Sequence, residues 1–94
     1  MDISKSLKDL RIKTGLRQNH AAELIGISQT YLSQIENGVK EPSTPMLESI
    51  CKVYAVPVPI LYFNALTVDD IPNRKKKIFI ELKPVIDNLI SQFF

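Results

Sequence analysis

Apolar residues recur at intervals of three and four through most of this chain, which is the spacing of one face of an α-helix. Glycines, prolines and capping residues interrupt the pattern and mark where helices begin and end. Thr44 is expected to cap the fourth helix, with Pro45 as its first residue. The pattern predicts five helices, over about 3–14, about 17–25, from Ser28 to Asn37-Gly38, from Thr44 to about Tyr54, and a short one that ends near Phe63. Strand-like alternation is absent from residues 1–63, so the predicted class is all-α.

The remaining third of the chain divides into a linker and a further helix. Residues 64–72 are interpreted as a linker between a first domain, 1–63, and a C-terminal segment, 73–94. The C-terminal segment has the amphipathic pattern of a helix, so the whole is expected to be a five-helix domain with one additional helix. That helix opens with the four cations Arg74-Lys75-Lys76-Lys77, where the helix dipole disfavours positive charge.

Pro84 lies inside the predicted C-terminal helix. Its ring has no N–H to donate to the carbonyl of Ile80, so a kink or a break is expected at this position. The run Ile78-Phe79-Ile80 is β-prone, which leaves a strand over 77–82 as an alternative to the helix.

Composition and charge narrow the class of protein. The chain has 94 residues, of which 45% are hydrophobic, enough for one domain with a core. A net charge of +2 is compatible with nucleic acid as a partner only if the cations gather on one face. One cysteine provides no disulfide framework, and no apolar run approaches a membrane span or a secretory signal. We expect a cytoplasmic protein with no membrane partner.

Candidate catalytic groups are few. The single histidine, His20, has no cysteine or carboxylate at a recognisable spacing, and Cys51 is expected to be a small core residue. There is no phosphate-binding glycine loop and no set of metal ligands. We therefore expect no enzymatic activity, no metal and no cofactor.

The spacing between the second and third predicted helices is more specific than helical periodicity. Ala22 is small where the two helices would cross, Gly26 can take the left-handed conformation that turns the chain, and Ser28 can start the next helix. When two helices are joined in this way, the second helix packs on the core with one flank and exposes the other. A helix exposed in this manner has a diameter that fits the major groove of DNA.

The outward flank of the third predicted helix carries amides and hydroxyls rather than the Glu and Lys of an ordinary solvated helix. Side chains of this kind can read base edges, and Gln can pair bidentately with adenine. The residues on this flank are Gln29, Thr30, Ser33 and Gln34, with Tyr31 alongside.

Residues 7–62, about three fifths of the chain, resemble the Xre or Cro/phage-repressor helix-turn-helix family. The segments that carry the resemblance are LKDLRIKTGL, QNHAAELIGIS, QTYLSQIENG and PSTPMLESICKVYAVP. The resemblance implies a domain of five helices that binds a pseudo-palindromic operator in double-stranded DNA as a dimer. Two residues depart from the family pattern: Arg17 stands where Ser or Thr usually caps a helix, and Ala21 is smaller than the usual apolar residue.

The resemblance also implies roles for individual residues. The third helix becomes the recognition helix, with Gln29, Thr30 and Gln34 at base-reading positions and Ser33 as a lesser candidate. Arg11 and Glu36 match a pair that joins the first helix to the end of the third. Gln18 matches a residue that typically binds phosphate, and Asn37 and Lys40 match phosphate or minor-groove contacts just past the recognition helix. Apart from the resemblance, Arg17 and Tyr31 are also expected at phosphates.

The predicted function is therefore a homodimeric transcriptional regulator. Two alternatives share the fold: an antitoxin, which would hold a toxin through the C-terminal segment, and the controller protein of a restriction–modification system. The dimer is expected to form through the C-terminal stripe, because one domain has too little surface to cover it. The competing hypothesis folds that segment back to compensate for Ala21 and places the dimer at Ile60, Leu61 and Phe63. The stripe comprises Ile78, Leu82, Val85, Ile86, Leu89, Ile90, Phe93 and Phe94.

Overall fold

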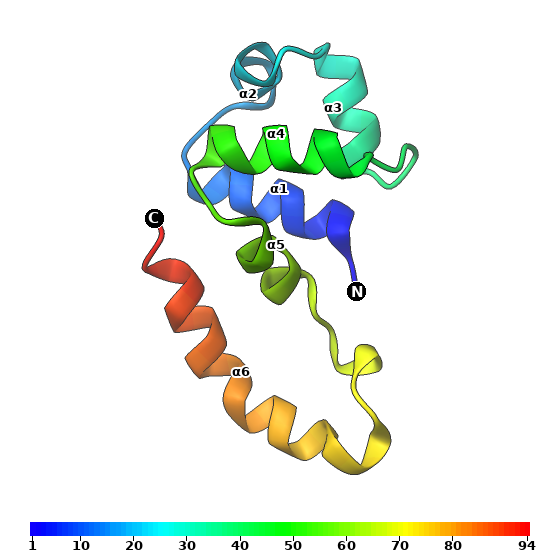
Figure 1. Ribbon diagram of the computed structural model, residues 1–94, viewed down its shortest axis with the longest axis vertical. Helices are drawn as coiled ribbons and strands as arrows, with labels where there is room; N and C mark the ends of the chain where they lie inside the picture. Colours follow the sequence, from blue (N-terminus) through cyan, green and yellow to red (C-terminus); the bar gives the residue numbers. More distant parts are fainter.

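The computed structural model describes all 94 residues and contains helices but no strand, which confirms the predicted class (Figure 1). Its elements are α1 (Ile3–Lys13), α2 (Gln18–Ile25), α3 (Gln29–Glu36), α4 (Thr44–Tyr54), α5 (Val58–Ala65), the 3₁₀ turns η1 (Val68–Asp70) and η2 (Asn73–Lys75), and α6 (Lys76–Ser91). No single helix is long and apolar enough to cross a membrane. Only α4 and α5 taken together meet the requirements of length and composition, and these two helices are bent by 98° relative to each other.

Local chemistry explains where the central helices begin and end. Gly26 ends α2 with φ at 90°, a left-handed conformation that costs glycine little. The Ser28 hydroxyl then caps α3 by accepting a hydrogen bond from the backbone N–H of Tyr31 at 3.0 Å. The prediction for α4 was wrong by one residue. Ser43, not Thr44, is the cap, because its hydroxyl accepts from the N–H of Met46 at 3.2 Å.

The core lies where α1, α2, α3, α4 and α5 converge, and α6 contributes to it from outside. Ala21 is fully buried there, and Cys51 occupies a small core position on α4. The buried cluster consists of Leu7, Leu10, Ala21, Ala22, Leu32, Ile35, Leu47, Ile50, Cys51, Tyr54, Val56, Ile60, Leu61 and Ile90. In Figure 1 the α2–α3 pair lies at one end of the long axis, and α6 begins at the other.

Polar contacts fasten α1 to α5. The Ser6 hydroxyl donates to the carbonyl of Leu61 at 3.0 Å and accepts from the Asn64 amide at 2.9 Å, and the N–H of Asp2 donates to the carbonyl of Ala65 at 2.9 Å. These contacts explain why α5 continues two residues past its predicted end at Phe63. The segment predicted as a linker therefore begins inside α5.

Helix α6 runs without interruption through Pro84, so neither the break nor the strand over 77–82 occurs. Figure 1 shows the helix changing direction between its start and its end. Pro84 removes one backbone hydrogen bond. Because its ring is exposed to solvent, it disturbs no packing against the domain.

Apart from the exposed Ile80, the apolar residues of α6 form two adjacent faces. Ile90 is 1% exposed and belongs to the domain core, and Ile86 is half-buried against that core. Ile86 and Ile90 therefore pack within one copy, which departs from their expected place in the dimer. Four others on α6, together with Phe93 in the turn just after it, have 41–64% of their surface exposed, and we call them the outer stripe: Ile78, Leu82, Val85, Leu89 and Phe93. The segment thus folds back in part, as the competing hypothesis expected, and still leaves an apolar face uncovered.

Replacing Ile90 with alanine should lower the free energy of unfolding by about 2–5 kcal/mol, because the substitution opens a cavity in a closed core. Urea unfolding at one protein concentration measures it. The matched control is Ile80→Ala on the same helix, where the side chain is 60% exposed and the change should stay within about 0.5 kcal/mol. Equal effects of the two substitutions would show that the end of α6 does not pack on the domain.

Candidate nucleic-acid interface

Helix α3 presents its polar flank to solvent because its opposite flank is anchored in the core. Leu32 and Ile35 are completely buried. On the other side, Gln29 and Thr30 are exposed, and Ser33 and Gln34 are half-buried. The structure therefore brings all four predicted base-reading residues onto one accessible side of one short helix.

The ion pair expected between Arg11 and Glu36 is present and buried. The Arg11 Nε lies 2.7 Å from Glu36 Oε2, and Nη2 lies 3.1 Å from Oε1, a bidentate arrangement. The third nitrogen, Nη1, donates to the carbonyl of Leu16 at 2.8 Å. The hydrogen bond to Glu36 raises the pKa of Arg11, although burial acts against it. This contact joins α1, the turn before α2 and the end of α3.

Gln18 extends this contact to the start of α3. Its side-chain amide donates to Glu36 Oε1 at 3.1 Å, and its carbonyl oxygen accepts from the Gln29 amide at 3.5 Å, a long and weak bond. The first predicted base-reading residue is thereby linked to the buried carboxylate through one side chain. Sequence reasoning assigned Gln18 to phosphate only and missed its bond to Glu36, because nothing in helical periodicity places these two residues together.

Tyr54 of α4 lies in the core close to the ion pair, whereas the sequence marked it only as the approximate end of the fourth helix. Its hydroxyl is buried, and burial raises the pKa of Tyr54, with the negative charge of Glu36 adding to the effect. The phenol therefore stays neutral beside the pair. The buried hydroxyl has no hydrogen-bond partner among the protein atoms.

The residues expected at phosphates surround α3 from two sides. Arg17 is exposed at the start of α2. No side chain caps this helix, as expected from the replacement of the usual Ser or Thr by Arg17. Past α3, Asn37 donates to the Ser33 hydroxyl at 3.3 Å. Lys40 is exposed, and its backbone N–H donates to the carbonyl of Gln34 at 3.1 Å, which fixes its loop to the helix. Tyr31 differs from the others because it is half-buried against the core.

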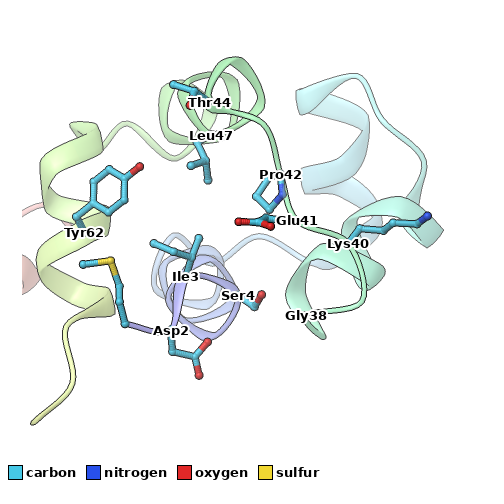
Figure 2. Close-up of a pocket in the computed structure, with 11 residues that line it drawn as sticks. Asp2, Ile3, Ser4, Gly38, Lys40, Glu41, Pro42, Thr44, Leu47 and Tyr62 are labelled. Carbon is cyan, nitrogen blue, oxygen red and sulfur yellow. The ribbon is translucent and has the colours of Figure 1, made fainter. Parts of the chain in front are cut away.

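A hollow of about 520 Å³ separates this loop from the N-terminal end of α1 and from α5 (Figure 2). Its walls include Ile3, Pro42, Leu47 and Tyr62. The Lys40 side chain points away from the hollow. The residue itself stays beside the end of α3, because its backbone N–H is bonded to the carbonyl of Gln34.

The chain has one histidine and one cysteine, and these two reactive side chains are not in contact. His20 is exposed on α2, whereas Cys51 is buried on α4, and burial raises the pKa of its thiol. No group of three or more His, Cys, Asp or Glu side chains is placed to hold a metal ion.

Replacing Glu36 with alanine should lower the free energy of unfolding by about 3–5 kcal/mol, because it leaves the Arg11 guanidinium buried without its partner. The control is Lys13→Ala, which removes an exposed ion pair with Asp9 and should cost less than about 1 kcal/mol. A double-mutant cycle with Arg11 isolates the pairwise energy. A coupling energy near zero would contradict the structural role given to this pair.

Comparison with known proteins gives the same arrangement a wider context. Residues 7–61 match the helix-turn-helix family. The chain is 39% identical over 54 residues to the antitoxin PezA of Streptococcus pneumoniae, which covers 57% of this chain and 34% of PezA. It is 37% identical over 62 residues to the ImmF control region 10 kDa protein of Bacillus phage phi105, covering 66% of this chain and 69% of that protein.

Among solved structures, the clp gene regulator ClgR from C. glutamicum superimposes with a TM-score of 0.65 at 30% identity, over 67% of this chain and 82% of ClgR. The chain therefore spans about a third of PezA but most of ClgR and of the phage protein. The matched segment contains all of α2, α3 and α4, and all of α1 except its first turn. It includes the turn at Gly26 and both partners of the buried ion pair. This chain belongs to the Xre/Cro-type helix-turn-helix family of DNA-binding transcriptional regulators.

Proposed function

We propose that this protein is a homodimeric transcriptional regulator that recognises a pseudo-palindromic operator in double-stranded DNA with helix α3. The observation that carries the proposal is the polar flank of α3, held outward by buried Leu32 and Ile35 and clamped at its end through Glu36. A helix of this size fits the major groove.

Base reading is assigned to Gln29, Thr30, Ser33 and Gln34. The exposed amide of Gln29 is placed to offer one donor and one acceptor to a base edge, the arrangement that pairs with adenine. Gln34 occupies the same flank, and its backbone carbonyl already anchors the loop that carries Lys40. The bonds to the Gln34 carbonyl hold the backbone of this loop beside the end of α3 and leave the Gln34 side-chain amide available to a base.

Phosphate contact is assigned to the two ends of this surface. The first turn of α2 has no side-chain cap, so its backbone N–H groups and the helix dipole are available to an anion next to Gln18. Arg17 adds a charge there, and Lys40 and Asn37 lie on the other side of α3. Tyr31 keeps only its partly exposed edge for such a contact. Together these groups would fix the register of α3 without reading sequence.

Dimerisation is assigned to the outer stripe of α6. An uncovered apolar face of five large side chains is costly in water, and a second copy would cover it. Helix α6 begins at the opposite end of the molecule from α3, so a dimer formed there leaves the DNA-facing surface free (Figure 1). The alternative interface on α5 is weakened because Ile60 and Leu61 are buried and only Phe63 is exposed.

A second candidate function, that of an antitoxin, is favoured by the similarity to PezA. In that case the chain would still bind its own operator, and the outer stripe would hold a toxin in place of a second copy. The two functions differ in what the purified protein does alone. A regulator of the first kind forms dimers without any partner, whereas a stripe reserved for a toxin leaves it monomeric.

Replacing Gln34 with alanine should weaken binding to the preferred DNA site by about 1–3 kcal/mol and relax the base preference at one position. Fluorescence anisotropy on a panel of single-base variants of the site measures both effects. Unaltered preference at every base pair would remove Gln34 from the reading surface.

The matched control for that experiment is Lys40→Ala. It should weaken binding to all sequences alike and flatten the dependence of log affinity on log salt by about one, because one phosphate contact is lost. A change in base preference in this variant would contradict its assignment to the phosphate backbone.

Dimerisation is tested by placing a charge in the outer stripe. Leu82→Glu should convert the dimer to a monomer, because a buried, unpaired carboxylate in the interface is strongly unfavourable. Sedimentation velocity at micromolar concentration provides the measurement. Ile80→Glu is the control, since Ile80 is as exposed as the stripe but lies on another side of the helix. A Leu82→Glu variant that remains dimeric would place the interface elsewhere.

A further inference from the structure

We propose that the two α6 helices of the dimer cross in antiparallel orientation, with the two-fold axis passing close to Val85. This inference rests on the proposed dimerisation through the outer stripe and adds the geometry of that contact. The occupant of the stripe is a second copy of this chain, and the arguments are the symmetry of the stripe, the charge along the helix and the width of the uncovered face.

The outer stripe is nearly symmetrical about its centre. Val85 lies in the middle, Leu82 and Leu89 flank it, and Ile78 and Phe93 stand at the two ends. When one helix is reversed against another, Leu82 therefore faces Leu89 of the second copy, and Ile78 faces its Phe93. At a rise of about 1.5 Å per residue the stripe is about 22 Å long, so an antiparallel pair buries its full length against itself.

Charge distribution along α6 separates this arrangement from a parallel one. Arg74, Lys75, Lys76 and Lys77 gather at its start, whereas the part after Lys83 carries no cation. A parallel pair would hold the two sets of four cations about 10 Å apart. The antiparallel pair instead places each set beside the C-terminal end of the other helix, where unsatisfied carbonyl groups carry partial negative charge.

The uncovered face has the width of one helix. On one side it is bounded by the domain itself, through Ile86 and Ile90. On the other side helical geometry places the polar residues Glu81, Asn88 and Gln92, all of which are exposed. Lys83 and Asp87, which form an ion pair, lie away from the stripe. A single apolar helix matches this strip, and α6 of a second copy has that shape.

Cysteine cross-linking tests the orientation in the full-length protein. The native Cys51 is 2% exposed and is replaced by alanine so that each variant carries only the introduced thiol. A disulfide requires the two Cα atoms to lie within about 4.4–6.8 Å, which makes it sensitive to register. After mild oxidation, Val85→Cys should link to itself across the axis. Ile78→Cys and Phe93→Cys should each remain unlinked alone, because their own copies would lie about 22 Å apart.

The diagnostic sample contains two variants. One is Ile78→Cys with an additional solubility tag, and the other is Phe93→Cys without a tag. Mixing should produce a cross-linked species with the summed mass of the two chains on a non-reducing gel. Ile80→Cys, which is exposed but off the stripe, is the control for random collision and should give no such species.

Self-linking of Ile78→Cys or of Phe93→Cys would overturn the antiparallel arrangement in favour of a parallel one. A protein that sediments as a dimer yet links at none of these positions would show that another surface, such as the apolar hollow beside Tyr62 and Phe63, forms the interface. A protein that sediments as a monomer would remove the proposed dimer itself, and this inference with it, and would favour a different protein as the occupant of the stripe.

Discussion

The surface proposed to face DNA depends on one buried contact, the bidentate ion pair between Arg11 and Glu36. A charge pair of this kind contributes little to net stability compared with an apolar core, but losing one partner is expensive. Its importance is geometric. Arg11 also binds the carbonyl of Leu16, and Glu36 also accepts from Gln18, so one cluster sets the positions of α1, α2 and α3 relative to each other. The side chains proposed to read bases stand on the helix that this cluster holds.

The C-terminal helix solves a different problem, which is how a small domain closes its core while keeping a surface for association. Ile90 closes the core from outside, and the outer stripe remains uncovered. If the outer stripe forms the proposed dimer, one helix couples the stability of the domain to its assembly. For this reason removal of the whole segment would disturb both properties at once, whereas single substitutions on one face separate them.

Much of the fold was predictable because local chemistry determines it. Gly26 and Ser28 specify the turn between α2 and α3, and the resemblance to the family placed Arg11 opposite Glu36. Predictions failed where neighbouring residues offered equal solutions. Ser43 and Thr44 are both residue types that cap helices, so the sequence alone does not distinguish them, and in the structure Ser43 is the cap. The end of α4 at Tyr54 was predicted correctly, although the residue that follows, Ala55, has φ at 56°, a conformation in which glycine is more common.

The fate of α6 was only half predictable, because periodicity reveals an apolar arc without showing which part of it the domain covers. The contact between Gln18 and Glu36 also depends on three helices meeting and has no local signal.

Selecting bound sites from random DNA with the purified protein tests the central claim most directly. The account predicts an enriched pseudo-palindrome whose half-sites lie about one helical turn, or 34 Å, apart. No enriched sequence, or a single unrepeated half-site bound by a monomer, would contradict it.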